Sequence, residues 1–494
     1  MSQIKIKNLS FSYNSQNVIF DNLSLEFDSN WKLGLIGRNG KGKTTLLKLL
    51  SGELKGKGNV DMSVKFQYFP TKIENINSSI QDLIENQFIN IESWKIYKEL
   101  NLINFNMQNL FTCYKNLSGG EQVKFQLAIM FAQDETFQLL DEPTNNLDQA
   151  TKNKIVEYLQ NKKGFIIVSH DRWLLDNCID HVISINKNSI DLQKGNFSSW
   201  DENFNRKLNE EIIKNQSLQK DIDRLELAKI KTKQWANKSE KQKSAKVNDS
   251  AVIDKGFIGA RAARLQKHSK IIENRIENAI EEKRSLLNDF EKEKFIKICP
   301  NYFDNDELLI EGKNINYFIK ERKILNNVNF ILRGGDRLFI QGENGSGKTS
   351  LIKIIMSKIN DYSGYLYIKN KLKLSYVSQD LSMLKGKLED YINEKKFDKS
   401  LFLTLLSKLG VENKDFYNNI ECMSDGQKKK ILLCSSLIEK ADVYIWDEPL
   451  NFVDIVSRKQ IENLIKKYKP TMIVIEHDKF FLDNIATSVL HLSY

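Results

Sequence analysis

The chain contains few of the residues that support disulfide, zinc or membrane chemistry. Its 494 residues include 5 prolines, 5 cysteines and 5 histidines, and no apolar run approaches the roughly 18–20 residues that a membrane span needs. The thiols form no CxxC pair, and an odd, scattered set fits a reducing compartment; they are Cys113, Cys178, Cys299, Cys422 and Cys434. The chain starts with strand-like alternation rather than a signal peptide. We therefore expect a cytoplasmic protein without a membrane segment or zinc site.

Length, composition and charge set the broad class. At roughly 150 residues per domain, the chain should hold two to four domains. Apolar residues make up 41% and charged residues 28%, so a core can form and global disorder is excluded. The formal net charge of +10 indicates an anionic partner, unless it reflects only a lysine-rich composition.

Four motifs occur twice in the same order. The pairs are GRNGKGKTT from Gly37 and GENGSGKTS from Gly342, LSGGEQ from Leu117 and MSDGQK from Met423, LLDEPTNNLD from Leu139 and IWDEPLNFVD from Ile445, and VSHDRW from Val168 and IEHDKF from Ile475. Each pair is separated by 305 to 307 residues, which chance does not explain. We therefore predict two copies of one domain, at 1–200 and 301–494, with 201–300 between them.

Within each copy, short apolar runs predict an α/β fold. KLGLIG, FQLLDE and GFIIVSH in the first copy, and RLFIQG, VYIWDE and TMIVIEH in the second, are typical of buried parallel strands. Each run ends just before a motif. Ligand loops at the carboxyl ends of parallel strands are where α/β proteins place their chemistry.

The segment 201–300 has a different character. Residues 202 to about 247 lack proline and glycine and predict one helix, and residues from about 260 to 294 predict another. Apolar positions with spacings of seven and four suit an antiparallel helical hairpin with its tip near 248–259; they are Leu265, Ile272, Ile276, Ile280 and Leu287. A solvated spacer is the alternative.

The glycine-rich motifs have the GxxxxGK[ST] pattern of a phosphate loop, in which backbone N–H groups and a helix N-terminus surround phosphate oxygens. The lysines Lys43 and Lys348 should contact the β- and γ-phosphates, and Thr44 and Thr349 should bind Mg²⁺. The remaining expected nucleotide contacts in the loops are Gly37, Asn39, Gly40, Gly42, Thr45, Gly342, Asn344, Gly345, Gly347 and Ser350.

Strand-end acids and histidines complete each expected site. Asp141 and Asp447 end apolar runs and should orient Mg²⁺, while Glu142 and Glu448 follow and should polarise the attacking water. His170 and His477 each follow a strand, where a neutral imidazole would reach the γ-phosphate. A structural role is the alternative for either histidine, and the matched offset favours the functional one.

Two tyrosines are candidate adenine contacts. Tyr13 precedes Gly37 by 24 residues, and Tyr317 precedes Gly342 by 25. Either ring stacks on adenine or packs as a core aromatic at a strand end; the sequence leaves both readings open.

These motifs together resemble an ATP-binding cassette, and two cassettes joined by a helical linker of about 100 residues resemble the ABC-F proteins. The resemblance covers essentially the whole chain. It implies an α/β protein with two tandem ATP-binding-cassette domains joined by a long antiparallel α-helical hairpin linker. It also implies ATP and Mg²⁺ as cofactors, ATP hydrolysis, and a monomer whose cassettes pair head to tail. Site one then combines the first cassette's residues with Ser424 and Gly426, and site two combines the second cassette's with Ser118, Gly119 and Gly120.

Two departures from the family pattern fall on site one. Gln379 (YVSQD) provides the glutamine expected near Mg²⁺ in the second cassette, but the first cassette reads YFPT, with Thr71 in that place. The second signature reads MSDGQ, so Asp425 replaces a glycine and brings a carboxylate near phosphates. We therefore expect site one to hydrolyse ATP more slowly than site two.

The compact layout resembles the Lsa-type antibiotic-resistance ABC-F proteins, on SNWKLGLIGRNGKGKTTLL, IWDEPLNF and FIGARAAR. The spacing from Lys43 to Ser118 leaves no room for the arm of housekeeping members, and the chain ends 17 residues after His477. The resemblance implies binding at the ribosomal E site, contact with 23S rRNA and P-site tRNA of the 70S ribosome, and protection against lincosamides, pleuromutilins and group A streptogramins.

The linker's charge agrees with an RNA partner. Residues 229–270 hold 12 Lys/Arg and 3 acids, whereas the flanks are close to neutral. Apolar residues at a tip are costly without a partner, and Trp235 and Phe257 either stack on bases or pack against their own stem. The expected tip contacts are Lys246, Val252, Ile253, Lys255, Phe257, Arg261 and Arg264. A housekeeping translation factor, or the ATPase subunit of a transporter, remain the alternatives.

Overall fold

The computed structural model describes residues 3–13, 18–61, 64–145, 147–185, 190–241, 270, 301, 303–304, 306–343 and 345–492. The chain forms two compact units, one of Met1–Trp200 with Phe295–Tyr494 and the other of Asp201–Lys294. The first unit holds two copies of one α/β arrangement. The boundaries of the three expected domains stay a prediction.

The first copy is built from two sheets. Strands β1 (Gln3–Ser12), β2 (Val18–Asp28) and β4 (Lys57–Asp61) form an antiparallel sheet in the order β2-β1-β4. The second sheet has the order β5-β6-β7-β3-β8-β9 and is parallel except for its last strand. Its strands are β3 (Lys32–Gly37), β5 (Lys65–Phe69), β6 (Thr136–Asp141), β7 (Phe165–Val168), β8 (His181–Ile185) and β9 (Ile190–Lys194).

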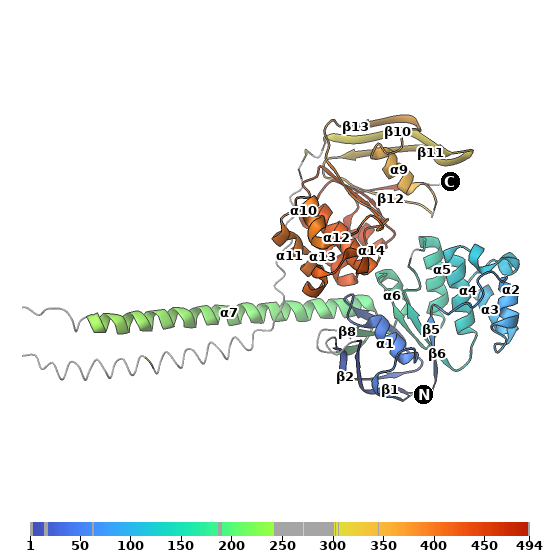
Figure 1. Ribbon diagram of the computed structural model, residues 1–494, viewed down its shortest axis with the longest axis horizontal. Helices are drawn as coiled ribbons and strands as arrows, with labels where there is room; N and C mark the ends of the chain where they lie inside the picture. The colour runs from blue at the N-terminus through green and yellow to red at the C-terminus, as the bar shows by residue number, and fades with distance from the viewer. Residues whose placement is uncertain are drawn as a thin grey trace, which may run out of the picture. The chain divides into compact units, whose positions relative to one another are not determined.

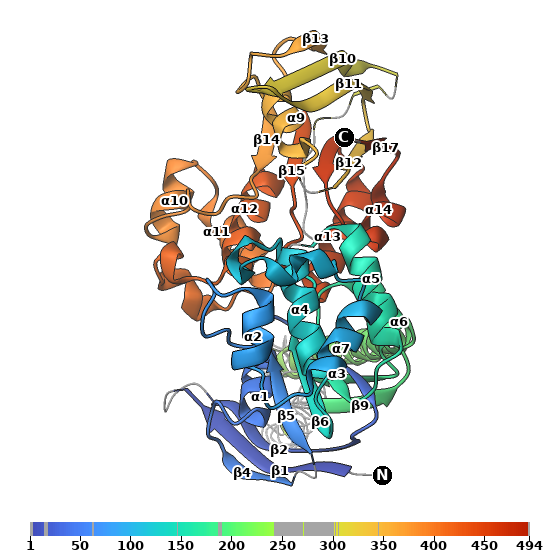
Figure 2. The same ribbon diagram turned by 90° about the vertical axis from the view of Figure 1, so that its right-hand side faces the viewer.

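Helices complete the first copy in two groups. Figure 2 shows α2, α3 and α4 together, apart from the antiparallel sheet of β1, β2 and β4. This helical group contains α2 (Ile80–Asn86), α3 (Ser93–Leu102), the 3₁₀ turns η1 (Met107–Phe111) and η2 (Tyr114–Asn116), and α4 (Gly119–Phe131). The others are α1 (Lys43–Leu50), α5 (Gln149–Gln160) and α6 (Arg172–Cys178).

The second copy repeats this plan. Its antiparallel sheet has the order β11-β10-β13, and its parallel sheet the order β14-β15-β16-β12-β17. The strands are β10 (Leu308–Ile319), β11 (Arg322–Arg333), β12 (Arg337–Gln341), β13 (Ser363–Ile368), β14 (Leu374–Val377), β15 (Val443–Asp447), β16 (Met472–Ile475) and β17 (Ser488–His491). Figure 1 shows its helical group, α10 to α12, on the side of the parallel sheet opposite the strands β10, β11 and β13.

The second copy's helices match those of the first. They are α9 (Lys348–Ile355), α10 (Leu388–Glu394), α11 (Lys399–Lys408), η3 (Asn413–Tyr417), η4 (Ile420–Cys422), α12 (Asp425–Ile438), α13 (Ile455–Tyr468) and α14 (Lys479–Ile485). All six apolar runs form the expected parallel strands: β3, β6 and β7, and β12, β15 and β16.

The buried faces of these strands account for the arrangement. Leu33, Leu35 and Leu139 are fully buried between the antiparallel sheet and the parallel sheet, in one cluster with Leu46 and Leu47 of α1. Near-continuous apolar runs are required because parallel strands are covered on both faces. The motifs therefore emerge at one edge, where each buried strand ends.

The segment between the copies is described in part. Helix α7 runs from Phe197 to Lys241, which begins five residues before the expected start at 202. The second expected helix, at 260–294, and the tip lie outside the described residues, apart from Lys270, so the hairpin stays a prediction. None of the described helices combines the length and apolar character that crossing a bilayer requires.

Candidate nucleotide-binding sites

The two glycine-rich loops each open a helix whose first N–H groups are uncapped. Strand β3 leads into residues 37–42, and α1 begins at Lys43 with Gly42 at its N-cap in the left-handed region, at φ 89°. A Cβ at Gly42 would lie 2.5 Å from Cγ2 of Ile19 and would also require a disfavoured backbone, so glycine is needed. Gly347 has the same role before α9, at φ 87°. Uncapped helix N-termini bind anions well, and these loops therefore fit phosphates.

Both loop lysines lie against their own loop. Lys43 Nζ donates to Gly37 O at 2.7 Å, and Lys348 Nζ donates to Gly342 O at 2.7 Å and to Glu343 O at 2.8 Å. Burial lowers the pKa of both lysines, while nearby carboxylates act in the opposite direction. Each ammonium group is thus held where a phosphate would replace backbone carbonyls as its partner.

The aspartates that end β6 and β15 each lie beside a tyrosine, Tyr68 for Asp141 and Tyr376 for Asp447. Tyr68 on β5 donates its hydroxyl to Asp141 Oδ2 at 2.9 Å. Thr349 Oγ1 donates to Asp447 Oδ2 at 3.1 Å, while the buried Oδ1 of Asp447 has no partner. An orphaned carboxylate oxygen beside a threonine hydroxyl fits a hard cation such as Mg²⁺. The described residues contain no cluster of three His, Cys, Asp or Glu side chains suited to a metal, so any Mg²⁺ would rely on such mixed ligands and on the nucleotide.

The two glutamates sit in an unusual backbone conformation. Glu142 and Glu448 have φ values of 50° and 48°, and each N–H donates across the sheet, to Val168 O and Ile475 O, at 2.9 Å. Burial raises the pKa of Glu142 to about 7, and burial, followed by the charges of Glu476 and Asp447, raises the pKa of Glu448. A carboxylate with a raised pKa is better suited to accept a proton near neutral pH.

The side-chain partners of these glutamates differ between the copies. His170 donates its backbone N–H to Glu142 Oε2 at 3.3 Å, and its Nε2 lies 3.3 Å from Oε1. Glu448 Oε2 instead accepts from Gln379 Nε2 at 2.7 Å and from Asn451 Nδ2 at 2.6 Å. Thr71, in the first copy, does not take the place of Gln379: among the described residues its backbone N–H donates to Gln126 Oε1 at 3.0 Å, and it makes no hydrogen bond to Glu142.

Both histidines are held in the neutral form. Burial lowers the pKa of His170 well below its usual value, and burial together with Lys348 lowers the pKa of His477 to about 4. His477 Nε2 is buried without a partner. A neutral imidazole with one open nitrogen can donate to or accept from a ligand, which agrees with the expected contact with phosphate oxygens.

The signature serines begin helices through capping boxes. Ser118 caps α4 and exchanges hydrogen bonds with Glu121, and Ser424 caps α12 and exchanges them with Gln427. The carboxylate of Asp425, the departure in the second signature, lies 3.8 Å from Lys428 Nζ and is largely exposed. Its charge is therefore partly balanced within the first turn of α12.

Site one is assembled from both copies. Asn39 Nδ2 in the first phosphate loop donates to Phe452 O at 2.8 Å, and a Cβ built on Gly426 would lie 2.9 Å from the same Nδ2. The second signature thus lies against the first phosphate loop. At site two, the field of Asp148 in the first copy acts to raise the pKa of Lys348.

For both candidate tyrosines, stacking on adenine and packing in the core stay open as interpretations. Tyr13 is 57% exposed, its hydroxyl lies 3.1 Å from Thr45 Oγ1, and its ring meets Phe11 edge-on. Tyr317 is partly buried against the second copy's core. Tyr13 therefore lies next to the first phosphate loop with a ring free to stack, whereas Tyr317 is more strongly a core residue.

Several site residues escaped sequence reasoning because they carry no motif. Tyr68 contacts Asp141, and Asn451 contacts Glu448. Lys429 of α12, buried, donates to Ser378 O at 2.9 Å and Asp447 O at 3.1 Å, and burial lowers its pKa to about 8. Comparing the copies position by position would have flagged it, since Val123 stands 306 residues earlier.

Other expected contacts cannot be placed. Asn344 and the tip residues lie outside the described residues; the latter are Lys246, Val252, Ile253, Lys255, Phe257, Arg261 and Arg264.

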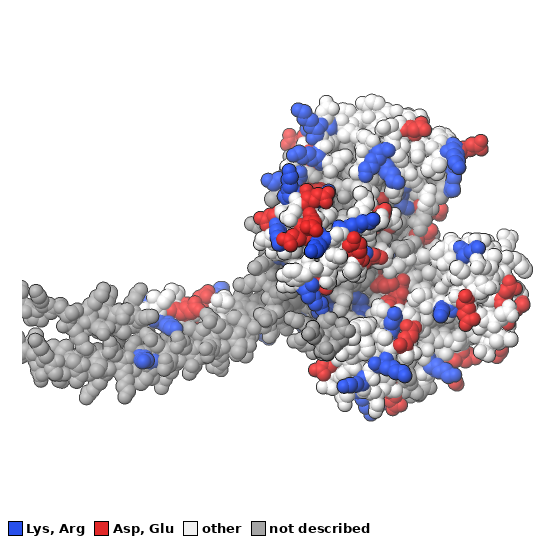
Figure 3. All heavy atoms as spheres, viewed as in Figure 1, with Lys and Arg blue, Asp and Glu red and all other residues white. Residues whose placement is uncertain are grey.

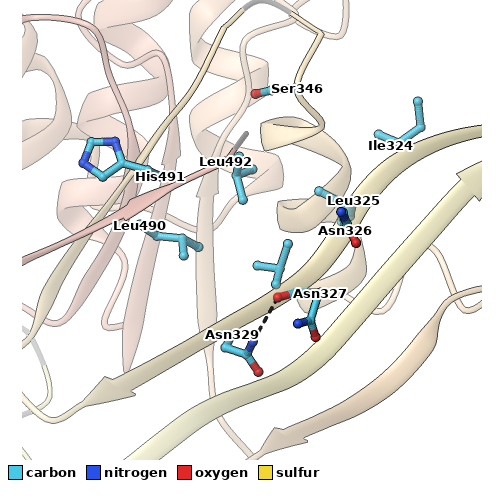
Figure 4. A pocket seen from close by; sticks show the side chains of 10 residues that line it. Ile324, Leu325, Asn326, Asn327, Asn329, Ser346, Leu490, His491 and Leu492 are labelled. Carbon is cyan, nitrogen blue, oxygen red and sulfur yellow. Dashed lines mark hydrogen bonds between the residues drawn. The ribbon is translucent and has the colours of Figure 1, made fainter. Parts of the chain in front are cut away.

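A hollow of about 290 Å³ in the second copy is lined by Ser346 and by residues of β11 and β17. Figure 4 shows the hydrogen bond from Asn329 to Asn327 in its wall, with Ser346 of the phosphate loop at its edge. Ser346 is its single residue from that loop, so the hollow is distinct from the phosphate cradle.

Comparison with known proteins supports this geometry. The family model described as "ABC transporter" matches residues 20–145 and 325–451, which together make up half of the chain. Each match contains one phosphate loop, one signature and one strand-end acid pair.

The chain is also similar along its length to curated proteins. It is 27% identical to the Ribosome protection protein VmlR of Bacillus subtilis (strain 168), over 99% of this chain and 86% of VmlR. It is 30% identical to the ATP-binding protein Uup of Buchnera aphidicola subsp. Acyrthosiphon pisum (strain APS), over 98% of this chain and 80% of Uup.

A solved structure shows the same fold. In the complex of archaeal ribosomal stalk protein aP1 and archaeal ribosome recycling factor aABCE1, a matching chain superposes with a TM-score of 0.62 at 18% identity, covering 98% of this chain and 87% of that one. The two phosphate loops, the repeated family match and the relatives that match along the whole chain all indicate the same family. The chain belongs to the ATP-binding cassette family, as an ABC-F ATPase with two tandem cassettes.

Proposed function

We propose that this ATPase binds the ribosome and protects the peptidyl-transferase centre from antibiotics. The observation that carries the proposal is the similarity to a ribosome protection protein over 99% of the chain, linker included. The expected drugs are lincosamides, pleuromutilins and group A streptogramins. The tip at 248–259 would reach the drug pocket or the P-site tRNA from the E site, and the protein would act in the cytoplasm as a monomer.

The distribution of charge supports an RNA partner at the linker. Residues 229–270 carry a net charge of +9, and binding to a phosphate backbone grows with such clusters. On the face shown in Figure 3, the described basic and acidic side chains of the cassettes are interspersed. Leu227 and Ile230 on α7, at the start of this basic segment, are exposed at 58% and 52%, which suits a macromolecular contact.

The residues of each cassette have distinct tasks in this proposal. Lys43 and Lys348 bind phosphate oxygens, and Asp141 and Asp447 with Thr44 and Thr349 hold Mg²⁺, which supplies charge neutralisation when bound. Glu142 and Glu448 orient water and accept its proton. The signature residues contact phosphate only when the cassettes are closed, which couples ATP to shape.

One set of variants tests the proposal against its alternatives. The Glu142→Gln/Glu448→Gln protein, with ATP, should sediment with 70S ribosomes, and expression of the natural protein should raise the inhibitory concentration of a lincosamide. Reversing the tip charges Lys255 and Arg261 to Glu should remove protection while ATPase activity persists. Reversing Lys214 and Lys220, which are exposed on the shaft of α7, provides the matched control.

The alternatives give other outcomes. Sedimentation without any change in susceptibility would favour a translation factor with no drug role. If the protein does not sediment with ribosomes in the presence of ATP, both hypotheses of a ribosome-binding protein are contradicted. The ATPase subunit of a transporter would then be the remaining hypothesis.

A further inference from the structure

Arg172 is a buried arginine of the first cassette that contacts the second. It is the first residue of α6, two positions after His170, and only 3% of it is exposed. Its guanidinium donates through both terminal nitrogens to the carboxylate of Glu462 on α13, with Nη1 at 3.3 Å from Oε2. Nη2 also lies 3.5 Å from Asp478 Oδ1, and the guanidinium carbon is 5.4 Å from the centre of the Phe480 ring.

The contact continues into the loop that closes site one. Arg458 Nη1 donates to Asp478 Oδ2 at 2.9 Å, and the same guanidinium donates to Val453 O at 2.9 Å and Leu450 O at 2.8 Å. That loop also supplies Phe452 O, the acceptor for Asn39 in the first phosphate loop. A continuous chain of contacts therefore runs from the His170 segment to the far side of site one.

The charges of this cluster balance. The two arginines face two carboxylates, and both guanidinium groups lower the pKa of Asp478. All four side chains are nearly inaccessible to water. Removing one partner from a buried ion pair leaves an uncompensated charge and is far more costly than losing an exposed pair.

The pseudo-equivalent positions lack this contact. The ion pair within each cassette is repeated: Lys152 Nζ lies 3.3 Å from Asp171 Oδ2, and Arg458 Nη1 lies 2.9 Å from Asp478 Oδ2. The position equivalent to Arg172, however, is Lys479, which is exposed, and the position equivalent to Glu462 is Val156, a buried apolar residue. A bidentate ion pair cannot form from a lysine and a valine.

We propose that Arg172, Glu462 and Asp478 form a one-sided latch that holds the cassettes closed over site one, and that the cassettes separate first at site two. Each charge is rehydrated when the cassettes part, so the intact latch adds modest stability to the closed state. Its loss penalises the closed state alone. The latch rests on the proposed ATPase cycle and is independent of the ribosome.

The test measures release of ATP in the absence of ribosomes. In the Glu142→Gln/Glu448→Gln chain, radiolabelled ATP is loaded and then chased, and the release rate is followed by filtration. Arg172→Ala and Glu462→Gln should each speed release of the slower ATP by at least about tenfold, while the matched control Lys479→Ala stays within about twofold. Arg172→Lys should recover part of the retention, because a lysine makes one contact where the guanidinium makes two.

Two further measurements separate a latch from a general structural role. Arg172→Met/Glu462→Met removes both charges and should release ATP more slowly than Arg172→Met or Glu462→Met alone, as a double-mutant cycle shows for a coupled pair. The melting temperature with ATP should fall more in Glu462→Gln than the melting temperature without it. Equal acceleration by Lys479→Ala would overturn the one-sided assignment, and unchanged release in Arg172→Ala and Glu462→Gln would overturn the latch.

Discussion

Site one and site two share their motifs but differ in what surrounds the glutamate that we propose as the catalytic base. At site one, Glu142 lies against His170, and Thr71 occupies the position that Gln379 has in the second cassette. At site two, Glu448 is bonded to Gln379 and Asn451. The same set of motifs can therefore build two unequal sites. Site one has side-chain contacts between the two cassettes, whereas site two has more hydrogen-bond donors that orient its glutamate.

The largest test of this comparison is removal of each glutamate. If site two carries most of the turnover, Glu448→Gln should lower steady-state ATPase activity by about 10²–10³-fold, because a general base contributes about 10²–10⁴-fold. Glu142→Gln should cost less. Steady-state and single-turnover hydrolysis of the two variants provide the measurement, and the reverse order would contradict the predicted inequality.

The buried charges beneath site two give the next largest effect. Lys429 and Glu476 stand where the first cassette has Val123 and Ser169, and Glu476 is the strongest opposing charge acting on Lys429. Lys429→Val should lower the free energy of unfolding by about 1–3 kcal/mol, since it leaves the buried carbonyl oxygens of Ser378 and Asp447 without the donor that Lys429 supplies. Lys429→Val/Glu476→Ser, which copies site one, should be more stable than Lys429→Val. Urea unfolding measures both, and an additive double variant would disprove the pairing.

The glutamine of site two should matter less than its glutamate. Gln379→Ala removes a hydrogen bond to Glu448, and its loss should slow turnover by roughly tenfold, the equivalent of one charge-assisted hydrogen bond. Gln379→Glu is the size-matched control, which keeps the reach and adds a repelling charge. Thr71→Gln should speed single turnover at site one; if it changes nothing, the missing glutamine does not explain the inequality.

The pH profile should distinguish the sites more gently. Burial raises the pKa of Glu142 to about 7, so this carboxyl is largely protonated at pH 6 and ionised at pH 8. In the Glu448→Gln background, kcat/KM should rise several-fold through pH 7. The same shift means that the free energy of unfolding falls as the pH rises from the unfolded pKa of about 4.5 to about 7, and that the loss is complete above pH 7 and absent below 4.5. Hydrolysis from pH 5.5 to 8.5 provides the check, and a flat profile would rule out Glu142 as the titrating base.

The smallest effect concerns an exposed pair between the cassettes. Lys41 Nζ lies 3.2 Å from Glu412 Oε1, and the two side chains are 31% and 46% exposed, far more than those of the Arg172 cluster. Because solvent screens such pairs, Lys41→Ala should change ATP release by less than about twofold in the same chase assay used for Arg172. An effect as large as that of Arg172→Ala would show that burial does not set the strength of these contacts.

Much of the fold could be predicted because each buried strand carries its own signal. Six strands of the parallel sheets are predictable from their continuous apolar runs, since strands covered on both faces must be apolar throughout. The linker could be predicted as helical from its lack of proline and glycine, and α7 begins five residues earlier because Phe197 and Trp200 are buried at its start.

The candidate sites were predictable only where a motif marks the chemistry. The lysines, aspartates and glutamates of the motifs are recognisable by their fixed spacing. Tyr68 and Asn451 belong to no motif, and only the folded structure brings them to Asp141 and Glu448. The contacts of Arg172 could not be predicted from the sequence, because its acceptors lie 290 and 306 residues further along the chain. Interactions between distant segments depend on how the cassettes pack, which spacing within one motif does not encode.

The left-handed backbone of the two glutamates places a restriction on how this protein can change over generations. Residues other than glycine, asparagine and aspartate are disfavoured at φ near 50°. Replacing Glu142 or Glu448 by glycine would relieve that strain and, with the roles proposed above, would remove the base that hydrolysis needs. Selection for folding and selection for turnover therefore oppose each other at these two positions, and a lineage that lost the need for hydrolysis would drift toward a more stable, inert nucleotide binder.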